Sequence, residues 1–185
     1  MVDLVDLVHV YDDVLDSQTC QKLIDFYESN EKLYERISNN GTPNFTQINL
    51  TENHNQSDEI KSIHNLLISK VFEYKKLYYD FIDARCFPNE HAFEQFRIKK
   101  YNPGGEDRFD THVDVKDYAS ARRFLSFFWY LNEVDDGGET IFADKIIKPK
   151  TGKLVVFPPL WMYPHRGAPP ISNPKYIMST YLHYK

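Results

Sequence analysis

The feature that most constrains the fold is a change in the spacing of apolar residues near residue 90. Beyond this point the chain consists of short segments with the alternation or the brief apolar runs typical of β-strands. Turn signals such as Asn102-Pro103-Gly104-Gly105 separate them. The predicted strands cover residues 92–101, 124–132, 139–142, 145–148, 153–157 and 176–183. Short, closely spaced strands favour a β-sandwich or jelly roll.

Two helical stretches precede these strands. Asp16 and Ser17 are typical of the start of a helix, and apolar residues recur at three- and four-residue steps over 18–29. A second helix is predicted from Asp58 to about Tyr79. We therefore expect an α+β fold in which N-terminal helices pack on one sheet of a jelly roll.

Residues 38–57 contain several Asn residues and turn signals, and they have little apolar periodicity. We interpret them as a long, mobile loop with a short strand near 45–50. Two roles stay open for this loop. It is either a lid that closes over a bound substrate or an ordinary surface loop.

The length and charge of the chain limit the class of protein to which it can belong. We assign residues 1–185 to one domain, with a helical part over about 1–90 and a β core over about 91–185. The net charge of −5 argues against nucleic acid and anionic membranes as main partners. Residues 1–6 are acidic where a signal peptide is basic, and the longest apolar stretch, 124–131, is too short to span a bilayer. We expect a soluble, cytoplasmic protein, and both monomer and dimer stay open.

The cysteines suggest no chemistry. Cys20 and Cys86 lack the spacing of a metal site, so we expect two reduced, partly buried thiols rather than a disulfide or a nucleophile.

The residues that indicate chemistry are His112-Val113-Asp114 and, much later in the chain, His165. Alternation along an extended segment would place His112 and Asp114 on one face, whereas only folding of a sheet could bring His165 to them. Two imidazoles and one carboxylate can bind one face of an iron(II) ion and leave other positions open for reactants. A His-x-Asp pair alone is weak evidence, because both histidines could be unrelated surface or core residues.

Lys175 stands at the start of the last predicted strand. If its ammonium group reaches an interior of aromatic side chains, it needs an anionic partner, because an unpaired buried charge is costly. A dicarboxylate cosubstrate would supply that partner. A solvated lysine at the end of a strand is the alternative.

Together these residues resemble the catalytic core of 2-oxoglutarate and iron(II)-dependent dioxygenases, in particular the prolyl 4-hydroxylase branch. The resemblance covers most of the chain and is weakest from about Glu31 to Phe87. The matching segments are Val14-Leu15-Asp16 with Cys20, Tyr101-Asn102-Pro103-Gly104, His112-Val113-Asp114, Arg123, Tyr130-Leu131-Asn132-Glu133-Val134, Gly137-Gly138-Glu139-Thr140-Ile141-Phe142, Pro149-Lys150-Thr151-Gly152, His165, Lys175 and Leu182-His183.

The resemblance implies a double-stranded β-helix, which is a form of jelly roll, and a metal centre of three ligands. His112, Asp114 and His165 would bind iron(II), with no catalytic side chain beyond this centre. Lys175 and Tyr130 would bind the distal carboxylate of 2-oxoglutarate.

The resemblance also suggests residues near the substrate. Tyr101 would line the pocket for the cosubstrate and the substrate, and Arg123 and Tyr181 stand where related enzymes place groups that touch the substrate. Purely structural alternatives stay open: Tyr130 and Tyr181 could be core aromatics, and Arg123 could be a surface charge.

The implied activity is hydroxylation of prolyl residues in a peptide or protein, with Fe(II), 2-oxoglutarate and O2, release of succinate and CO2, and ascorbate as a candidate reductant. Three alternatives remain: a hydroxylase of a free amino acid or other small molecule, a non-catalytic binding module on the same fold, and a nucleic-acid demethylase, for which the chain offers no basic run. Departures from the family pattern lie in residues 92–101, after Arg36, and in Trp161-Met162-Tyr163-Pro164. They affect the identity of the substrate more than the chemistry.

Overall fold

The computed structural model describes residues 4–39, 42–82, 87, 88 and 90–185. The helices are η1 Leu4–Leu7, α1 Ser17–Glu28, η2 Glu31–Leu33, α2 Leu50–Asn53, η3 His54–Gln56 and α3 Asp58–Phe81. The strands are β1 His9–Tyr11, β2 Glu35–Ser38, β3 Asn44–Asn49, β4 Ala92–Phe93, β5 Arg97–Tyr101, β6 Phe109–His112, β7 Arg123–Tyr130, β8 Thr140–Phe142, β9 Lys145–Ile147, β10 Leu154–Phe157, β11 His165–Gly167 and β12 Lys175–His183.

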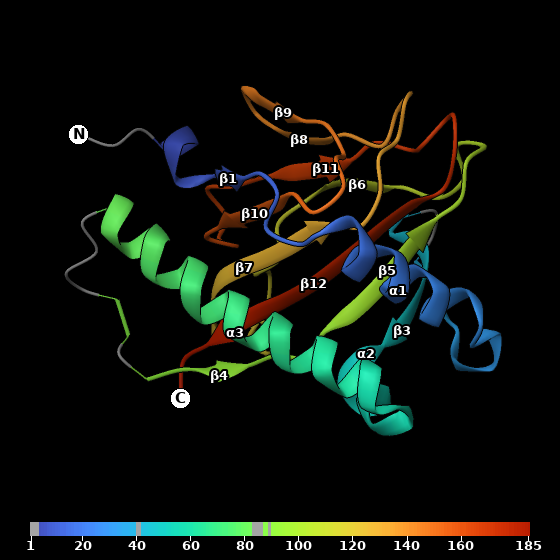
Figure 1. Ribbon diagram of the computed structural model, residues 1–185. Helices are drawn as coiled ribbons and strands as arrows, with labels where there is room; N and C mark the ends of the chain where they lie inside the picture. The colour runs from blue at the N-terminus through green and yellow to red at the C-terminus, as the bar shows by residue number, and fades with distance from the viewer. Residues whose placement is uncertain (1–3, 40–41, 83–86, 89) are drawn as a thin grey trace.

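Within the described residues, these strands form two antiparallel sheets. The large sheet has eight strands in the order β1-β10-β7-β12-β5-β3-β2, with β4 beside β12, and the small sheet has the order β6-β11-β8-β9. Figure 1 shows the small sheet on one side of the large sheet and α3 running across the other side. The prediction of a sheet-based fold with a few helices is confirmed, and the sheets are antiparallel.

Both predicted helices form and begin at capping residues. The side chain of Asp16 accepts a hydrogen bond from the Thr19 amide at 2.7 Å, and the side chain of Ser57 accepts one from the Ile60 amide at 3.1 Å. Each cap satisfies an amide that has no partner within the first turn of its helix. The helices end at Glu28 and Phe81, close to the predicted ends.

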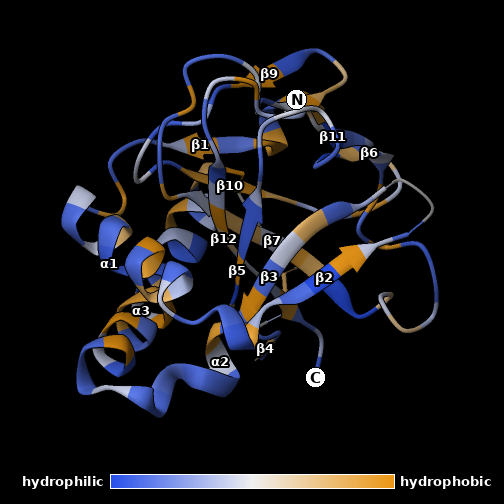
Figure 2. Cartoon of the chain, turned by 90° about the vertical axis from the view of Figure 1, so that its right-hand side faces the viewer, coloured by the Kyte–Doolittle hydropathy of each residue, from blue (hydrophilic) through white to orange (hydrophobic). Residues whose placement is uncertain are grey.

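The larger hydrophobic core lies between the helices and one face of the large sheet. Leu23 of α1, Leu67 of α3 and Trp129 of β7 have no exposed surface and belong to one cluster. Figure 2 shows α1 and α3 together on one side of the large sheet. A second, smaller cluster joins the opposite face of β7 and β10 to residues of β8 and β9, including Phe128, Phe142 and Phe157. The large sheet is therefore packed on both faces.

The short strand predicted near 45–50 is present, whereas residues 50–56 form short helices rather than the loop that the sequence suggested. Residues 44–49 form β3, which pairs with both β2 and β5, and α2 and η3 follow it. One of the polar side chains that suggested a loop, that of Asn49, caps α2. Residues 40 and 41 lie outside the described residues, as does Cys86, whereas Cys20 is buried and free.

The predicted strand over 92–101 is interrupted. The amide of Phe96 donates a hydrogen bond to the Thr51 hydroxyl at 2.8 Å, and the carbonyl of Phe96 accepts one from the Leu50 amide. These contacts with the start of α2 separate β4 from β5. The sequence interpretation also missed β1, β2, β6 and β11, which have only three or four residues each and therefore show no clear period.

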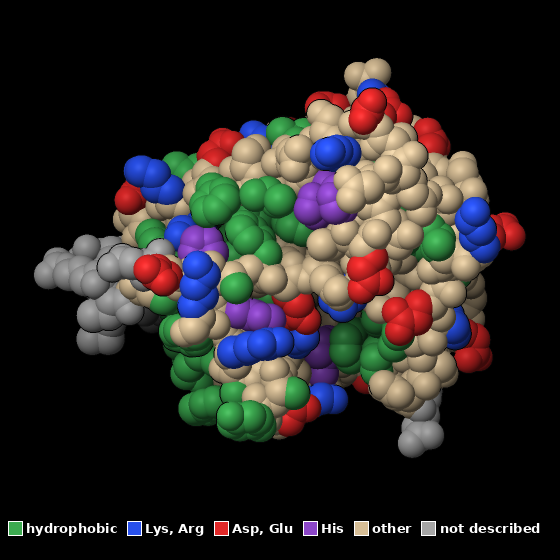
Figure 3. Space-filling model, turned by 90° about the horizontal axis from the view of Figure 1, so that it is seen from below, with side chains coloured by type: hydrophobic (Ala, Val, Ile, Leu, Met, Phe, Trp, Pro, Cys, Tyr) green, Lys and Arg blue, Asp and Glu red, His purple; other side chains and the backbone are tan. Residues whose placement is uncertain are grey.

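The surface of α3 carries several apolar side chains. Phe72, Leu77 and Phe81 are exposed. Figure 3 shows the underside of the view in Figure 1, where apolar side chains stand among acidic and basic ones. No helix in the described part of the chain has the length and apolar character needed to cross a membrane.

The packing of α3 on the sheet can be tested by two substitutions in the same helix. Leu67→Ala should lower the free energy of unfolding by about 2–5 kcal/mol, because it leaves a cavity in the core. Leu77→Ala should change it by less than about 1 kcal/mol, because Leu77 is 44% exposed. Urea denaturation followed by circular dichroism measures both, and equal effects would contradict the described orientation of α3.

Candidate functional site

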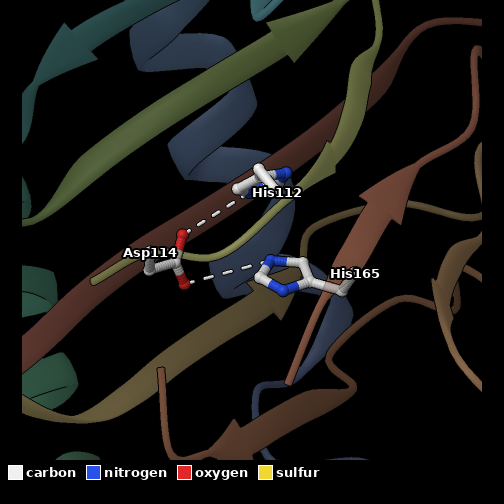
Figure 4. Close-up of side chains that lie close together, drawn as sticks. All are labelled: His112, Asp114 and His165. Atoms are coloured by element: carbon white, nitrogen blue, oxygen red, sulfur yellow. Dashed lines mark ion pairs between the residues drawn. The ribbon is translucent and has the colours of Figure 1, made fainter. Parts of the chain in front are cut away.

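Strand pairing brings the three predicted ligands together. β6 pairs with β11 so that His165 lies directly opposite His112, and Asp114 follows two residues after β6 ends. One ligand atom from each of the three residues lies within 4.8 Å of the others. The His112 Nε2 atom is 3.5 Å from Asp114 Oδ1, and the His165 Nε2 atom is 3.9 Å from Asp114 Oδ2 (Figure 4).

The opposite nitrogen of each imidazole faces a backbone carbonyl. The His112 Nδ1 atom is 2.7 Å from the carbonyl oxygen of Asp110, and the His165 Nδ1 atom is 3.1 Å from that of Tyr163. A carbonyl oxygen only accepts hydrogen bonds, so both Nδ1 atoms carry the proton. Both Nε2 atoms therefore direct a lone pair toward Asp114, which is the tautomer that a metal ligand requires.

Aromatic side chains fix the two imidazole rings. The ring of Phe109 stacks on His112 with centroids 3.3 Å apart and planes 7° apart. Phe142 stacks on His165 and Phe157 meets it edge-on, both with centroids 5.0 Å apart. These contacts restrict ring rotation, so the ligand atoms are positioned before any ion arrives.

The charges of the cluster favour an ionised carboxylate and a neutral imidazole. Burial alone would raise the pKa of Asp114, but the close side chains of His112 and His165 and the charge of Lys99 lower it to about 2. Burial lowers the pKa of His165, against the opposing charge of Asp114. A neutral imidazole beside a carboxylate is the protonation state in which both bind a cation.

Lys175 is buried at another wall of the same cavity. Its side chain is on the first residue of β12 and is 2% exposed. Its Nζ atom donates to the carbonyl of Gly138 at 3.0 Å and lies 4.6 Å from the centroid of the Tyr101 ring. Burial lowers the pKa of Lys175 from 10.5 to about 8, while the charge of Glu139 opposes this shift. Lys175 is therefore not the solvated lysine at the end of a strand that the sequence left open as the alternative.

Two glycines shape the surroundings of Lys175. Gly138 has φ +76°, and a Cβ there would lie 3.4 Å from the Lys175 side chain. Gly167 faces the charged end of the lysine, where an added Cβ would lie 3.6 Å from Nζ. The absent side chain of Gly167 leaves room in front of an ammonium group that has one acceptor and two further donor positions.

We call His112, Asp114 and His165 the metal-type cluster. The cavity between this cluster and Lys175 is lined by both polar and aromatic side chains. Tyr101 and Tyr181, two of the predicted site residues, line it. Tyr130 does not line it: the Tyr130 hydroxyl donates to Thr140 Oγ1 at 2.6 Å, and Thr140 forms the wall. The full lining comprises Lys99, Tyr101, Phe109, His112, Asp114, Ser126, Phe128, Thr140, Phe157, His165, Gly167, Lys175, Ile177, Ser179 and Tyr181.

Arg123 lies beside the cluster and is not a free surface charge. Its guanidinium forms two 2.7 Å hydrogen bonds with the carboxylate of Glu94 and donates to the backbone carbonyl of Asp114 at 2.9 Å. It also stacks over the Tyr181 ring at 4.2 Å. Glu94 in turn lies 2.9 Å from His183 Nε2. This network supports the backbone at Asp114.

A groove opens beside the cluster and shares part of its lining with the cavity. Residues of β2, β3, β5, β6 and β12 form its sides, together with Arg123 and Glu94. Lys99, His112, Asp114 and Tyr181 line both spaces.

Sequence reasoning missed Lys99, Thr140 and Glu94. Lys99 lies two residues before Tyr101 in β5, and side chains two residues apart in a strand point to the same face. That alternation was the available signal for Lys99. Glu94 had no such signal, because its role depends on contacts with Arg123 and His183 from distant strands.

Comparison with known proteins gives a family match and a curated relative. Residues 96–183 match the model of the 2OG-Fe(II) oxygenase superfamily. A probable prolyl 4-hydroxylase 9 from Arabidopsis thaliana is 39% identical over 64 residues, a match that covers 32% of this chain and 21% of the relative. The match thus spans only about a fifth of that relative's length.

Solved structures show the same fold. The viral collagen prolyl hydroxylase of Paramecium bursaria Chlorella virus-1 superposes with a TM-score of 0.72 at 21% identity and covers 97% of both chains. A Pseudomonas putida prolyl-4-hydroxylase gives a TM-score of 0.69 at 18% identity over 96% of this chain and 92% of its own. The resemblance to 2-oxoglutarate and iron(II)-dependent oxygenases, and to prolyl hydroxylases among them, is confirmed, and the fold is their jelly roll.

The burial of Lys175 predicts a distinct pH dependence of stability in the metal-free protein. Below about pH 8 the lysine is protonated in both the folded and the unfolded chain, so the cost of burial is fully present. Between about 8 and 10.5 the unfolded chain keeps more of the proton, and stability should rise with pH. Relative to Lys175→Met, the wild type should gain about 1 kcal/mol per pH unit in this window.

Urea denaturation at several pH values measures this difference. Lys76→Met serves as the control, because the Lys76 side chain is 76% exposed, and its stability should follow the wild type at every pH. Parallel curves for the wild type and Lys175→Met would show that water reaches the Lys175 ammonium in solution.

Proposed function

We propose that this chain is an iron(II)- and 2-oxoglutarate-dependent dioxygenase that hydroxylates prolyl residues in a peptide or protein and releases succinate and CO2. The observation that carries the proposal is one cavity that joins His112, Asp114 and His165 to the buried ammonium of Lys175. The match of residues 96–183 to the oxygenase superfamily supports it.

The donor set fits a ferrous ion. Two Nε2 lone pairs and a carboxylate converge, and both histidines hold the required tautomer through their carbonyl partners. We propose that His112, Asp114 and His165 hold the metal and leave positions open for reactants. Iron(II) with 2-oxoglutarate supplies the activation of O2 and the oxidation of a C–H bond.

The Lys175 end of the cavity fits a carboxylate. The ammonium group is enclosed, has one neutral acceptor, and faces the space that Gly167 leaves open. We propose that Lys175 binds the distal carboxylate of 2-oxoglutarate, with Tyr101 as a wall of that pocket. Tyr130 would contribute by orienting Thr140, to which its hydroxyl donates. These residues bind and orient the cosubstrate and exclude water from it.

The groove favours an extended substrate over a fully enclosed small molecule. It continues from His112 and Asp114 past β5 to residues of β2 and β3. A peptide needs such an open channel beside the reacting carbon, whereas a pocket for a free amino acid closes on all sides. We propose that Tyr181 and Arg123 contact the substrate where the groove meets the cavity.

Turnover assays separate the proposed function from its rivals. Iron-loaded protein with 2-oxoglutarate and ascorbate is given proline-containing peptides or free L-proline, and succinate and hydroxyproline are measured. Peptide-dependent formation of both products in equal amounts supports the proposal. Turnover with free L-proline alone would identify a small-molecule hydroxylase, and absence of iron-dependent turnover with every substrate would favour a binding module.

The metal ligands can be tested apart from activity. His112→Ala and Asp114→Ala should weaken Mn²⁺ binding at least about a hundredfold, since losing even a group that only supports a ligand costs 10–100-fold. Both variants should lose succinate formation while their unfolding transitions stay cooperative. His91→Ala is the matched control, because His91 lies outside the cluster. Undiminished Mn²⁺ affinity in Asp114→Ala would contradict the assignment.

The anchor for 2-oxoglutarate makes a separate prediction. Lys175→Ala should weaken 2-oxoglutarate binding to the Mn²⁺-loaded protein by about 2–5 kcal/mol, because a buried carboxylate loses its charge partner. Mn²⁺ affinity itself should change little, and the exposed-lysine variant Lys76→Ala should behave as the wild type. Calorimetric titration measures both ligands, and unchanged 2-oxoglutarate affinity would place the anchor elsewhere.

A further inference from the structure

We propose that Lys99 determines substrate specificity by pairing with a carboxylate of the substrate. This inference rests on the proposed function and deepens it, because it names a chemical requirement of the substrate. Its basis is the position of Lys99, its lack of a partner, and the charge balance of the cavity.

Lys99 stands where the cavity and the groove meet. It lies in β5 opposite Ile177 of β12 and Gln47 of β3, two residues before Tyr101. Its side chain lines both spaces, as do those of His112 and Asp114. A substrate that reaches the metal-type cluster through the groove must therefore pass this ammonium group.

Among the described residues, Lys99 has no hydrogen bond or ion pair, unlike its basic neighbours. Its Nζ atom lies 5.3 Å from the centroid of the Phe45 ring. Lys100, on the opposite face of the same strand, pairs with Glu28 at 2.8 Å. Arg123 donates two hydrogen bonds to the carboxylate of Glu94. Burial lowers the pKa of Lys99 to about 8 even with Asp114 nearby. An ammonium group in this state gains from a carboxylate partner.

The charges of the loaded cavity leave Lys99 without a counterion. The charges of a divalent metal, Asp114, Lys175 and the dianion 2-oxoglutarate cancel one another. Lys99 then adds one positive charge that none of these groups neutralises. The two carboxylates of the cosubstrate are already assigned, one to Lys175 and one to the metal end. Two other carboxylates line the groove, but Glu94 is engaged by Arg123 and His183, and Asp110 by Arg108. The remaining source of negative charge is the substrate that enters through the groove.

Two kinds of substrate carry the required group. One is a peptide with an acidic side chain next to the target proline. The other is a proline with a free α-carboxylate, as a free amino acid or at a C-terminus. Both present the same chemistry to Lys99, so the experiment must separate them.

The test uses capped peptides in which one side chain supplies the only carboxylate. The probes are Ac-Gly-Glu-Pro-Gly-Gly-NH2, its Gln counterpart, the pair with the acidic or amide residue after proline, and free L-proline. Each is titrated calorimetrically, without oxygen, into protein loaded with Mn²⁺ and 2-oxoglutarate. The wild type should bind one Glu peptide about tenfold more tightly than its Gln partner, the size of a charge-assisted hydrogen bond. Tight binding of L-proline alone would identify the α-carboxylate as the source.

Matched variants assign the preference to Lys99. Lys99→Met should abolish the preference by weakening acidic probes alone, and Lys99→Arg should keep part of it. Lys100→Met removes a lysine from the other face of β5 and should retain the full preference. If Lys99→Met does not fold, Lys99→Gln replaces it. In turnover assays the loss should appear in KM for the acidic substrate and leave kcat nearly unchanged.

Two results would overturn the inference. One is a wild type that binds the Glu and Gln peptides equally and does not bind L-proline. The other is a Lys99→Met protein that loses affinity for 2-oxoglutarate rather than for acidic probes, which would place Lys99 in the cosubstrate site. Neither result affects the proposed function, because succinate formation with neutral peptides would sustain it. Absence of turnover with every substrate would remove the proposed function itself.

Discussion

The pairing of β6 with β11 is the interaction on which the site depends. These strands have only four and three residues, yet their register sets His165 opposite His112. A slip of one residue would turn one imidazole to the other face of the small sheet. β8 holds the register from the other side, because Phe142 pairs with His165 in backbone and stacks on its ring. Aromatic packing on the two imidazoles thus stabilises both the pairing and the ligand geometry.

The predictability of each element followed from its length and its burial. The helices over 17–28 and 58–81 were predictable because each has a capping residue and a sustained period. The long strands β7 and β12 were predictable from apolar runs, whereas β6 and β11 are too short to show a period. The polar composition of 49–56 misled the interpretation because Asn and Thr side chains there bond to backbone groups of ordered segments. The three metal-type residues were predictable because the ordered set of motifs around them resembles the oxygenase family, whereas the His-x-Asp pair and its spacing from His165 are weak evidence by themselves.

Lys99 shows why part of the site was not predictable. Alternation along β5 put Arg97, Lys99 and Tyr101 on one face and Ile98 on the other. In an ordinary sandwich the polar face of such a strand meets solvent. Here the polar face lines the cavity, and the apolar face packs under the helices, where Ile98 has no exposed surface. Sequence period gives the division into faces, but it does not say which polar face encloses a ligand.

The two faces of the large sheet have different roles: one stabilises the fold, and the other lines the site. The helix-covered face supplies an apolar core. The other face carries Lys99 and Lys175, which line one cavity together with Asp114 from the segment after β6 of the small sheet. Burying two ammonium groups destabilises the empty protein, as the lowered pKa values of both lysines indicate. Ligands that supply the missing negative charge bind the folded chain alone, so each adds to its stability as its concentration exceeds the dissociation constant. Ligand binding in the cavity is therefore coupled to folding. The buried ammonium groups that destabilise the empty protein also make the cavity selective for anions.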